Sequence, residues 1–415
     1  MPHAVHPSSV ADASPRAPYA PHAAPESAPP DPPRAGAPLF DSFLMAGFEC
    51  STHVRRDGAR RDLVAQTHHD VHAAADYRRC TRLGVRTVRD GVRWHLGEGP
   101  DGRIAVAHEA ARVRAARDAG VQVVWDLWHY GTPDHLDVLS PAFPRRLARW
   151  ARAFARLVAA ETDRVPFYCP VNEISFVAWG GGDVAYLNPF CHGKGAHLKR
   201  QLARAAVEVT EALWAVDARA RVCHIDPVIH VVADPAKPQD APHAEAYRRS
   251  MFEAWDLIAG LQEPWLGGSL RHLDVVGVNF YPRNQWIHGR NTPIPPESPL
   301  WRPLDAILAE VHARYGRPLF VAETGCEHEH RAGWLRGIAG DVRRALAAGV
   351  PVEGLCWYPI LNHPGWDDDR HLQCGLWDYA GPAGERAAHD PLLAEWERQR
   401  VLLDAARADA APRAA

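Results

Sequence analysis

Eight short apolar segments alternate with longer helical patterns along this chain, and this alternation limits the fold more than any other feature. The segments span residues 39–49, 84–90, 121–129, 167–173, 221–228, 273–281, 317–325 and 352–359. Nearly continuous apolar strands are typical of a parallel sheet that is covered by helices on both faces. Eight such units predict an α/β fold with a closed (β/α)8 arrangement, the TIM barrel, with inserted loops.

The stretches between these segments have the periodicity of helices. Residues 143–164 and 197–220 carry apolar side chains at spacings of three and four, as one buried helix face requires. Three helical patterns end in "RLGV", "DAGV" and "AAGV", where glycine suits a helix C-terminus. An open, doubly wound sheet is the alternative, but no glycine-rich phosphate loop follows the first segment.

The first 38 residues differ from the rest. They are dominated by Ala, Pro, Ser and His and have no apolar periodicity, which predicts a disordered tail. The barrel is therefore expected over residues 39–410.

Composition narrows the range of partners. The formal net charge is −3 with acids and bases mixed, so neither nucleic acid nor an anionic membrane is an expected partner. No apolar segment reaches the roughly 20 residues that span a bilayer, and no hydrophobic signal core is present. Eight cysteines without CxxC spacing favour a reducing compartment. We expect a cytoplasmic protein that binds a small neutral molecule; the oligomeric state is not indicated.

Polar and aromatic residues close nearly every apolar segment. In chain order they are Glu49, Arg89, His129, Asn172, Glu173, Asp226, Asn279, Tyr281, Glu323 and Trp357. The carboxyl ends of barrel strands meet at one face, where TIM barrels have their active sites. Because burying so many ionisable groups is costly, this pattern predicts a site there.

Glu173 and Glu323 are the candidate catalytic pair, since they close the fourth and seventh segments. Either one alone could be a strand-end residue bound to backbone amides. Two facing carboxyl groups cleave glycosidic bonds: one protonates the departing oxygen, and the other attacks the sugar or activates water.

Six motifs resemble those of a known family, in the same order. "CPVNEISF" resembles the Asn-Glu motif of the clan A glycoside hydrolases, and "FVAETG" resembles the "ITENG" nucleophile motif of glycoside hydrolase family 1. "LGVRTVRDGVRW", "DLWHYGTP", "GVNFYPRN" and "GLCWYPILNHPGW" resemble further family 1 segments. The similarity extends from about Phe43 to Tyr379.

This resemblance implies a retaining β-glycosidase without cofactor or metal, acting on a glycoside or oligosaccharide. It makes Glu173 the general acid/base and Glu323 the nucleophile. The remaining implied roles are Arg89 and Tyr281 beside Glu323, Asn172 at the sugar 2-hydroxyl, His129 on the glycon, Trp357 under the sugar ring, and Asn279 and Trp366 as further substrate-binding residues.

The region that would recognise the glycon departs from the family pattern. His53 stands where the family has Gln, and Gly365 lies near the position of a glycon-binding Glu. The loop 365–371 contains Asp367, Asp368 and Asp369, which either restore carboxylate recognition or form a solvated acidic loop.

Three other functions stay open. A metal-dependent hydrolase would use ligands in residues 224–230 and 326–330, although neither segment has a recognised ligand spacing. A carbohydrate-binding barrel without turnover would not need two opposed carboxylates. A transglycosidase would share every catalytic residue with a hydrolase.

Overall fold

The structure is a computed structural model that describes residues 38–410. In this part of the chain, eight parallel strands close into a barrel in the order β1-β11-β10-β7-β5-β4-β3-β2. The barrel strands are β1 (Leu44–Gly47), β2 (Thr87–Gly91), β3 (Gln122–Asp126), β4 (Phe167–Cys169), β5 (Arg221–Pro227), β7 (Val275–Asn279), β10 (Leu319–Thr324) and β11 (Val352–Trp357). The predicted TIM barrel is confirmed, and each apolar segment contributes one strand. The predicted tail lies outside the described residues, apart from Pro38.

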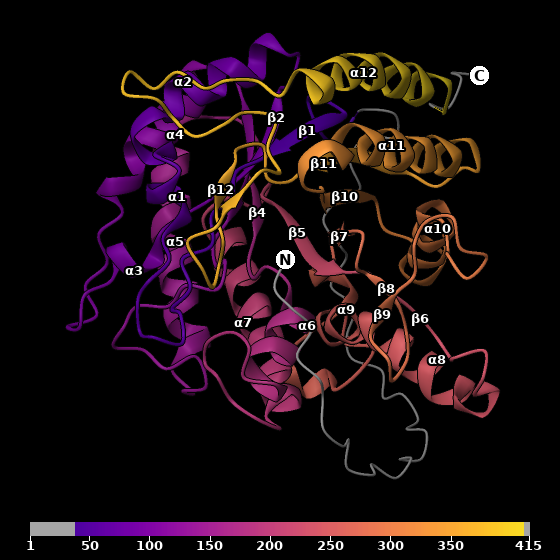
Figure 1. Cartoon of the computed structure of the whole chain (residues 1–415). Coiled ribbons are helices and arrows are strands. Elements are labelled where there is room, and N and C mark those ends of the chain that lie inside the picture. Colours follow the sequence, from indigo (N-terminus) through magenta and orange to yellow (C-terminus); the bar gives the residue numbers. More distant parts are fainter. Residues whose placement is uncertain (1–37, 411–415) are drawn as a thin grey trace, which may run out of the picture.

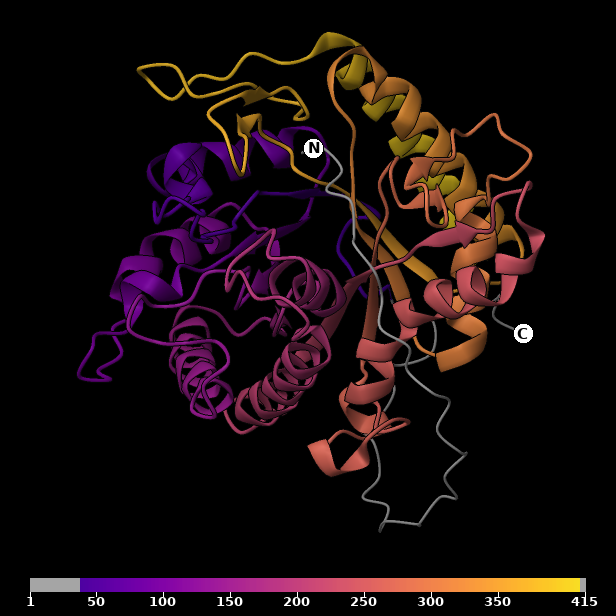
Figure 2. The same ribbon diagram turned by 60° about the horizontal axis from the view of Figure 1, so that its bottom comes forward.

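Helices lie outside the strands on all sides (Figures 1 and 2). They are α1 (Leu63–Gln66), α2 (His69–Arg82), α3 (Trp94–Gly97), α4 (Ala110–Asp118), α5 (Phe143–Glu161), α6 (Ile174–Val177), α7 (Gly195–Trp214), α8 (Ala241–Arg249), α9 (Glu253–Ile258), α10 (Leu304–Tyr315), α11 (Arg331–Ala347) and α12 (Asp390–Ala410). No helix within residues 38–410 has both the length and the apolar character needed to cross a bilayer.

Short strands occur in three of the loops that leave the carboxyl ends of barrel strands. A three-stranded sheet is formed by β6 (His230–Val232), β8 (Gln285–Ile287) and β9 (Thr292–Pro293). A two-stranded ribbon is formed by β12 (His363–Pro364) and β13 (His371–Leu372). The insertions are therefore on the face where a barrel has its active site.

The longest predicted helices form as their periodicity requires. In α5 the buried side chains include Leu147, Trp150, Phe154 and Val158, at spacings of three and four. Pro144 occupies the first turn, where its missing N–H costs nothing. The helix packs against α7, so its apolar stripe is covered by the barrel and by its neighbour (Figure 1).

The three predicted helix ends have the expected backbone. Gly84, Gly120 and Gly349 follow α2, α4 and α11 with φ of 79°, 67° and 82°. Glycine adopts this left-handed conformation without the penalty that a Cβ brings. Each turn returns the chain to the barrel strand that follows.

The barrel interior is filled by alternate residues of the strands. One apolar cluster contains Met45, Val124, Ile225, Phe320 and Cys356, each from a different barrel strand. Side chains along a strand alternate between its two faces, so residues two positions further on face the same interior. Toward the carboxyl ends this rule places Gly47, Asp126 and Tyr358 inside, and the apolar core gives way to polar groups.

Gly47 is the position where this interior is tightest. A Cβ there would lie 2.1 Å from Cδ2 of Tyr358. Gly47→Ala should therefore lower the free energy of unfolding by about 1–3 kcal/mol, as overpacking does, measured by urea denaturation.

Gly337→Ala is the matched control, since Gly337 lies in α11 with no atom within 4 Å of its added Cβ. That variant should be unchanged or more stable by up to about 1 kcal/mol. Equal losses in the two variants would show that the contact with Tyr358 is not the cause.

Candidate active site

A buried guanidinium organises the mouth of the barrel. Arg89, on β2, has no exposed surface. Its Nη1 donates to Oε1 of Glu323 at 2.6 Å, and its Nε and Nη2 donate to the two oxygens of Asp126 at 3.0 and 2.6 Å. Nη2 also donates to Oδ1 of Asn172 at 2.7 Å. Burial opposes the charge, but Asp126 and Glu323 hold the pKa of Arg89 well above its usual value, so it stays a cation.

Glu323 lies near the end of β10 with 4% of its surface exposed. The pairing of β10 with β7 shifts register between Val321 and Glu323, which marks an irregularity of the bulge type. Such irregularities re-aim side chains near active sites. Oε1 receives the Arg89 bond, and Oε2 accepts from the Tyr281 hydroxyl at 2.9 Å. Both oxygens therefore face donors, one of them a cation, and these contacts favour a carboxylate.

Glu173 follows β4 in a left-handed backbone conformation, with φ 52°, and begins α6. This conformation is uncommon for residues other than glycine and is found most often at functional sites. The backbone N–H of Glu173 donates to the Ile225 carbonyl at 3.0 Å, which holds the turn against β5. The side chain is thereby directed into the barrel mouth, where 8% of the residue is exposed.

The surroundings of Glu173 favour its neutral form. Burial, followed by the charge of Glu323, raises the pKa of Glu173 to about 8. Tyr130 donates to Oε2, and Nδ2 of Asn279 donates to Oε1 at 2.8 Å; these bonds act in the opposite direction but do not cancel the rise. Burial and the nearby charge of Glu323 therefore favour the protonated form of Glu173 at neutral pH.

Asn279 and Arg89 each connect Glu323 with Glu173 or with its neighbour in the chain. Asn279 pairs with Glu323 across β7 and β10, and its side chain contacts Glu173. Arg89 contacts both Glu323 and Asn172, the residue before Glu173. The predicted contacts of Arg89 and Tyr281 with Glu323 are thus both present, and the mouth contains one carboxyl group held neutral beside one held by a cation.

His129 is engaged within the protein by both ring nitrogens. Since Oδ1 of Asn172 accepts from Arg89, its Nδ2 faces Nε2 of His129 and donates to it at 3.1 Å. Nδ1 then carries the proton and donates to Asp126 at 2.9 Å. In this tautomer the imidazole orients Asn172. Burial opposes a charge on the ring, but the hydrogen bond and charge of Asp126 raise the pKa of His129 above its usual value. The role on the glycon that the resemblance implies is not visible in these contacts.

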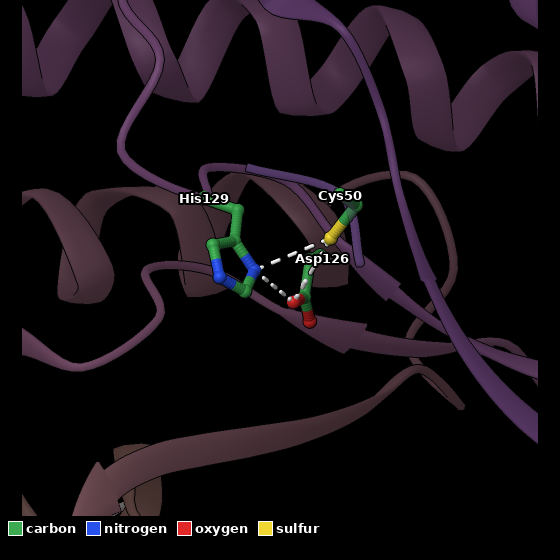
Figure 3. A group of neighbouring side chains, drawn as sticks. All are labelled: Cys50, Asp126 and His129. Carbon is green, nitrogen blue, oxygen red and sulfur yellow. Dashed lines mark hydrogen bonds and ion pairs between the residues drawn. The ribbon is translucent and has the colours of Figure 1, made fainter. Parts of the chain in front are cut away.

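Cys50, Asp126 and His129 point toward one another (Figure 3). Within residues 38–410 they are the one group of three His, Cys, Asp or Glu side chains whose potential metal-ligand atoms all lie within 4.8 Å of one another. Sγ of Cys50 lies 3.2 Å from Nδ1 of His129. Both Asp126 oxygens accept from Arg89, and Nδ1 of His129 donates to Asp126, so these side chains satisfy one another. The group is a hydrogen-bonded network that supports Arg89.

The two predicted tryptophans have different positions. Trp357 is fully buried at the end of β11, and its indole N–H donates to the Cys374 carbonyl at 3.0 Å. Trp366 is half-buried, with ring centroids 5.4 Å from Tyr130 and 5.5 Å from His53. Trp366 therefore lies beside the residue that binds Glu173, whereas Trp357 is covered by the chain.

The acidic loop makes its contacts with residues other than Glu173 and Glu323. Asp367, Asp368 and Asp369 are all exposed. Asp369 binds Arg61 at 3.0 Å, and Asp367 accepts from the Tyr186 hydroxyl at 2.8 Å. These contacts match a solvated loop fastened to its neighbours.

Sequence reasoning assigned no role to Asp126 and Tyr130, although both contact the site. Asp126 occupies an inward position two residues after Val124, and this charged residue inside an apolar segment was the available signal. Tyr130 adopts φ 67°, which turns the chain after His129, and no pattern in the sequence indicates that turn.

Comparisons with known proteins give a match by structure only. No family model and no curated protein matches the sequence. The chain is similar in structure to the family 1 β-glucosidase from Thermotoga maritima, with a TM-score of 0.67, 15% identity and coverage of 88% of this chain and 98% of that one. The complex of a Thermotoga maritima β-glucosidase with glucoimidazole gives a TM-score of 0.69 at 16% identity and the same coverage.

A hyperthermophilic β-glucosidase mutant is also similar, with a TM-score of 0.66, 14% identity and coverage of 86% of this chain and 98% of that one. Identities this low show a shared fold. The chain thus has the barrel of family 1 β-glucosidases over nearly their whole length.

Proposed function

We propose that this chain is a retaining β-glycosidase with Glu173 as general acid/base and Glu323 as nucleophile. The observation that carries this proposal is the unequal pair of buried carboxyl groups, one kept protonated and one bound by Arg89. A retaining glycosidase needs this division, since the acid must hold a proton while the nucleophile must be charged. The shared fold with family 1 β-glucosidases supports it.

In the first step, an oxygen of Glu323 attacks the anomeric carbon while the bond to the aglycon oxygen breaks. Glu173 transfers its proton to that oxygen, so an alcohol departs and a glycosyl ester on Glu323 forms. Glu173 is then a carboxylate, and the hydrogen bonds from Tyr130 and Asn279 stabilise its charge.

In the second step, Glu173 takes a proton from water as the water oxygen attacks the anomeric carbon. The ester bond breaks and Glu323 leaves as a carboxylate beside Arg89 and Tyr281. Two displacements restore the original configuration. For this mechanism we expect the carboxyl groups about 5 Å apart.

Substrate binding is proposed for Asn172, Asn279 and Trp366, and also for His129 and Trp357. For the last two, a sugar would have to replace contacts that they make within the protein. Oδ1 of Asn279 is buried without a hydrogen-bond partner among the described residues, so it is available to a sugar hydroxyl. The network around Arg89 keeps Asn172 rigid for a contact with the 2-hydroxyl. No cofactor or metal takes part in either step.

The direct test is to trap the intermediate. Wild type and Glu323→Gln are incubated with a panel of 2-deoxy-2-fluoro glycosyl fluorides, β-glucosyl first, and intact mass is measured. The fluorine slows the second step more than the first, so we expect a glycosyl adduct on wild type alone, located at Glu323 by peptide mapping. Hydrolysis of β-glycosides without any adduct, or an adduct on another residue, would disprove the assignment. A transglycosidase would form the same adduct but pass the sugar to a hydroxyl acceptor faster than to water.

The pKa of Glu173 gives a second test, through the pH dependence of kcat/KM. The acid is active while protonated, so activity should fall as pH rises through about 8. Tyr130→Phe removes a bond that stabilises the ionised form; the pKa of Glu173 should rise, and the alkaline limb should move up by about one pH unit.

Tyr186→Phe is the control, because the Tyr186 hydroxyl binds the exposed Asp367. Its alkaline limb should coincide with that of wild type. If Tyr130→Phe left the limb unmoved or lowered it, Glu173 would not be the titrating acid.

A further inference from the structure

A third buried glutamate faces the barrel mouth beside the catalytic pair. Glu49 follows β1 and continues its inward series after Met45 and Gly47. The turn is fixed by the Phe48 N–H, which donates to the Arg89 carbonyl at 2.9 Å. Only 5% of Glu49 is exposed. The side chain thus lies above Gly47, on the axis side of the strand next to Arg89.

The carboxyl group of Glu49 is only partly satisfied within the protein. Oε1 accepts from the Ser51 backbone N–H at 2.9 Å, and the Ser51 hydroxyl also helps to lower the pKa of Glu49. Within residues 38–410 the hydrogen-bond donors to this carboxyl group all belong to Ser51, and no Arg, Lys or His forms an ion pair with it. A carboxylate has about four acceptor positions, so one that is held by a single residue can still accept hydrogen bonds from the hydroxyl groups of a ligand.

His363, in the ribbon strand after β11, lies within electrostatic range of Glu49 and is 4% exposed. Its Nδ1 donates to the Pro364 carbonyl at 2.8 Å, so Nε2 carries a lone pair when the ring is neutral. Burial lowers the pKa of His363, which keeps the ring neutral. Among the described residues Nε2 has no hydrogen-bond partner, so the two side chains offer acceptors to the same region.

The same space adjoins the catalytic carboxyl groups. The charge of Glu49 acts on Tyr281 and Tyr130, whose hydroxyls bind Glu323 and Glu173 respectively. A ligand at Glu49 would therefore lie next to the sugar carbon that reacts.

The other residues considered for glycon recognition already have hydrogen-bond partners within the protein, lack a side chain, or lie on the exposed loop. His129 uses both ring nitrogens within the protein, and Nε2 of His53 donates to the Trp366 carbonyl at 3.2 Å. Gly365 has no side chain, and the carboxylates of the acidic loop are exposed. Glu49 is the buried carboxyl group left to recognise a sugar.

We propose that Glu49, with His363 beside it, accepts hydrogen bonds from hydroxyl groups of the neutral sugar ring whose anomeric carbon Glu323 attacks. This contact determines which sugar the enzyme accepts. The inference rests on the proposed glycosidase function and names the specificity residue of that site.

The test compares 4-nitrophenyl β-glycosides of the sugar that labels wild type with their 3-, 4- and 6-deoxy analogues, on wild type and on the isosteric Glu49→Gln. On the full sugar, Glu49→Gln should lower kcat/KM about 10- to 100-fold, the effect of disturbing a hydrogen bond to a charged group. For wild type, one deoxy analogue should have a kcat/KM lower than that of the full sugar by a similar factor. For Glu49→Gln, the same analogue should have nearly the same kcat/KM as the full sugar, because both changes remove the same bond. If the loss of kcat/KM caused by Glu49→Gln and the loss caused by removing a hydroxyl multiplied for all three analogues, the role of Glu49 would be overturned.

Asp367→Asn is the matched control, since it neutralises an exposed carboxylate of the acidic loop. It should keep the wild-type preference among the deoxy analogues; a changed preference there, with none in Glu49→Gln, would assign recognition to the loop and overturn the proposal.

The fluorosugar reaction separates the two levels of failure. Glu49→Gln should still be labelled at Glu323, more slowly than wild type, which shows that its catalytic pair is intact. If wild type neither hydrolyses nor is labelled by any sugar of the panel, the glycosidase function fails and this inference fails with it. If wild type is labelled but the losses multiply, the glycosidase function stands and only the role of Glu49 is lost.

Discussion

The arrangement of the active site depends on one buried cation. Arg89 binds Asp126 on β3, Glu323 on β10 and Asn172 after β4, so a single guanidinium joins four parts of the barrel. A guanidinium suits this position because its planar donors can serve several oxygens at once and it stays charged when buried. Removing one partner of such a group costs about 3–5 kcal/mol, since the other charge is left uncompensated. Arg89 is therefore expected to stabilise the barrel as well as to arrange the side chains at its mouth.

The two carboxyl groups acquire different chemistry from their surroundings. Glu323 receives a cation and a hydroxyl donor, whereas Glu173 has neutral donors and is buried near another negative charge. The barrel supplies these surroundings before any substrate arrives, which is the condition under which fixed dipoles and charges lower a reaction barrier. The left-handed turn at Glu173 and the irregular pairing before Glu323 direct the two side chains inward.

Much of the fold could be predicted because its determinants are local. The eight apolar segments became the barrel strands, and Gly84, Gly120 and Gly349 turned the chain as expected. The strand-end rule predicted that Arg89, Tyr281 and Glu323 share one face of the barrel, and the family resemblance implied that the first two lie beside Glu323, as they do. Seven of the eight strands end earlier than their apolar segments, with β2 as the exception, since the chain leaves the ladder near the polar residues that close the segments. The features of the site that could not be predicted from the sequence depend on contacts between residues far apart in the chain. His129 matched a family motif, yet the orientation of Asn172, which Arg89 imposes, engages its ring within the protein. The role proposed for Glu49 depends on the three-dimensional structure, in which its buried carboxyl group is held by Ser51 alone beside the two other glutamates. Low similarity in sequence thus conceals a shared barrel fold.

The stereochemistry of the first product tests the division between Glu173 and Glu323 most directly. Proton NMR would follow the sugar released from an aryl β-glycoside during the first minutes, before mutarotation mixes the anomers. A charged nucleophile beside Arg89 with a protonated acid opposite predicts that the β-anomer appears first. Initial release of the α-anomer would mean that water attacks the sugar directly, and Glu323 would then not be the nucleophile.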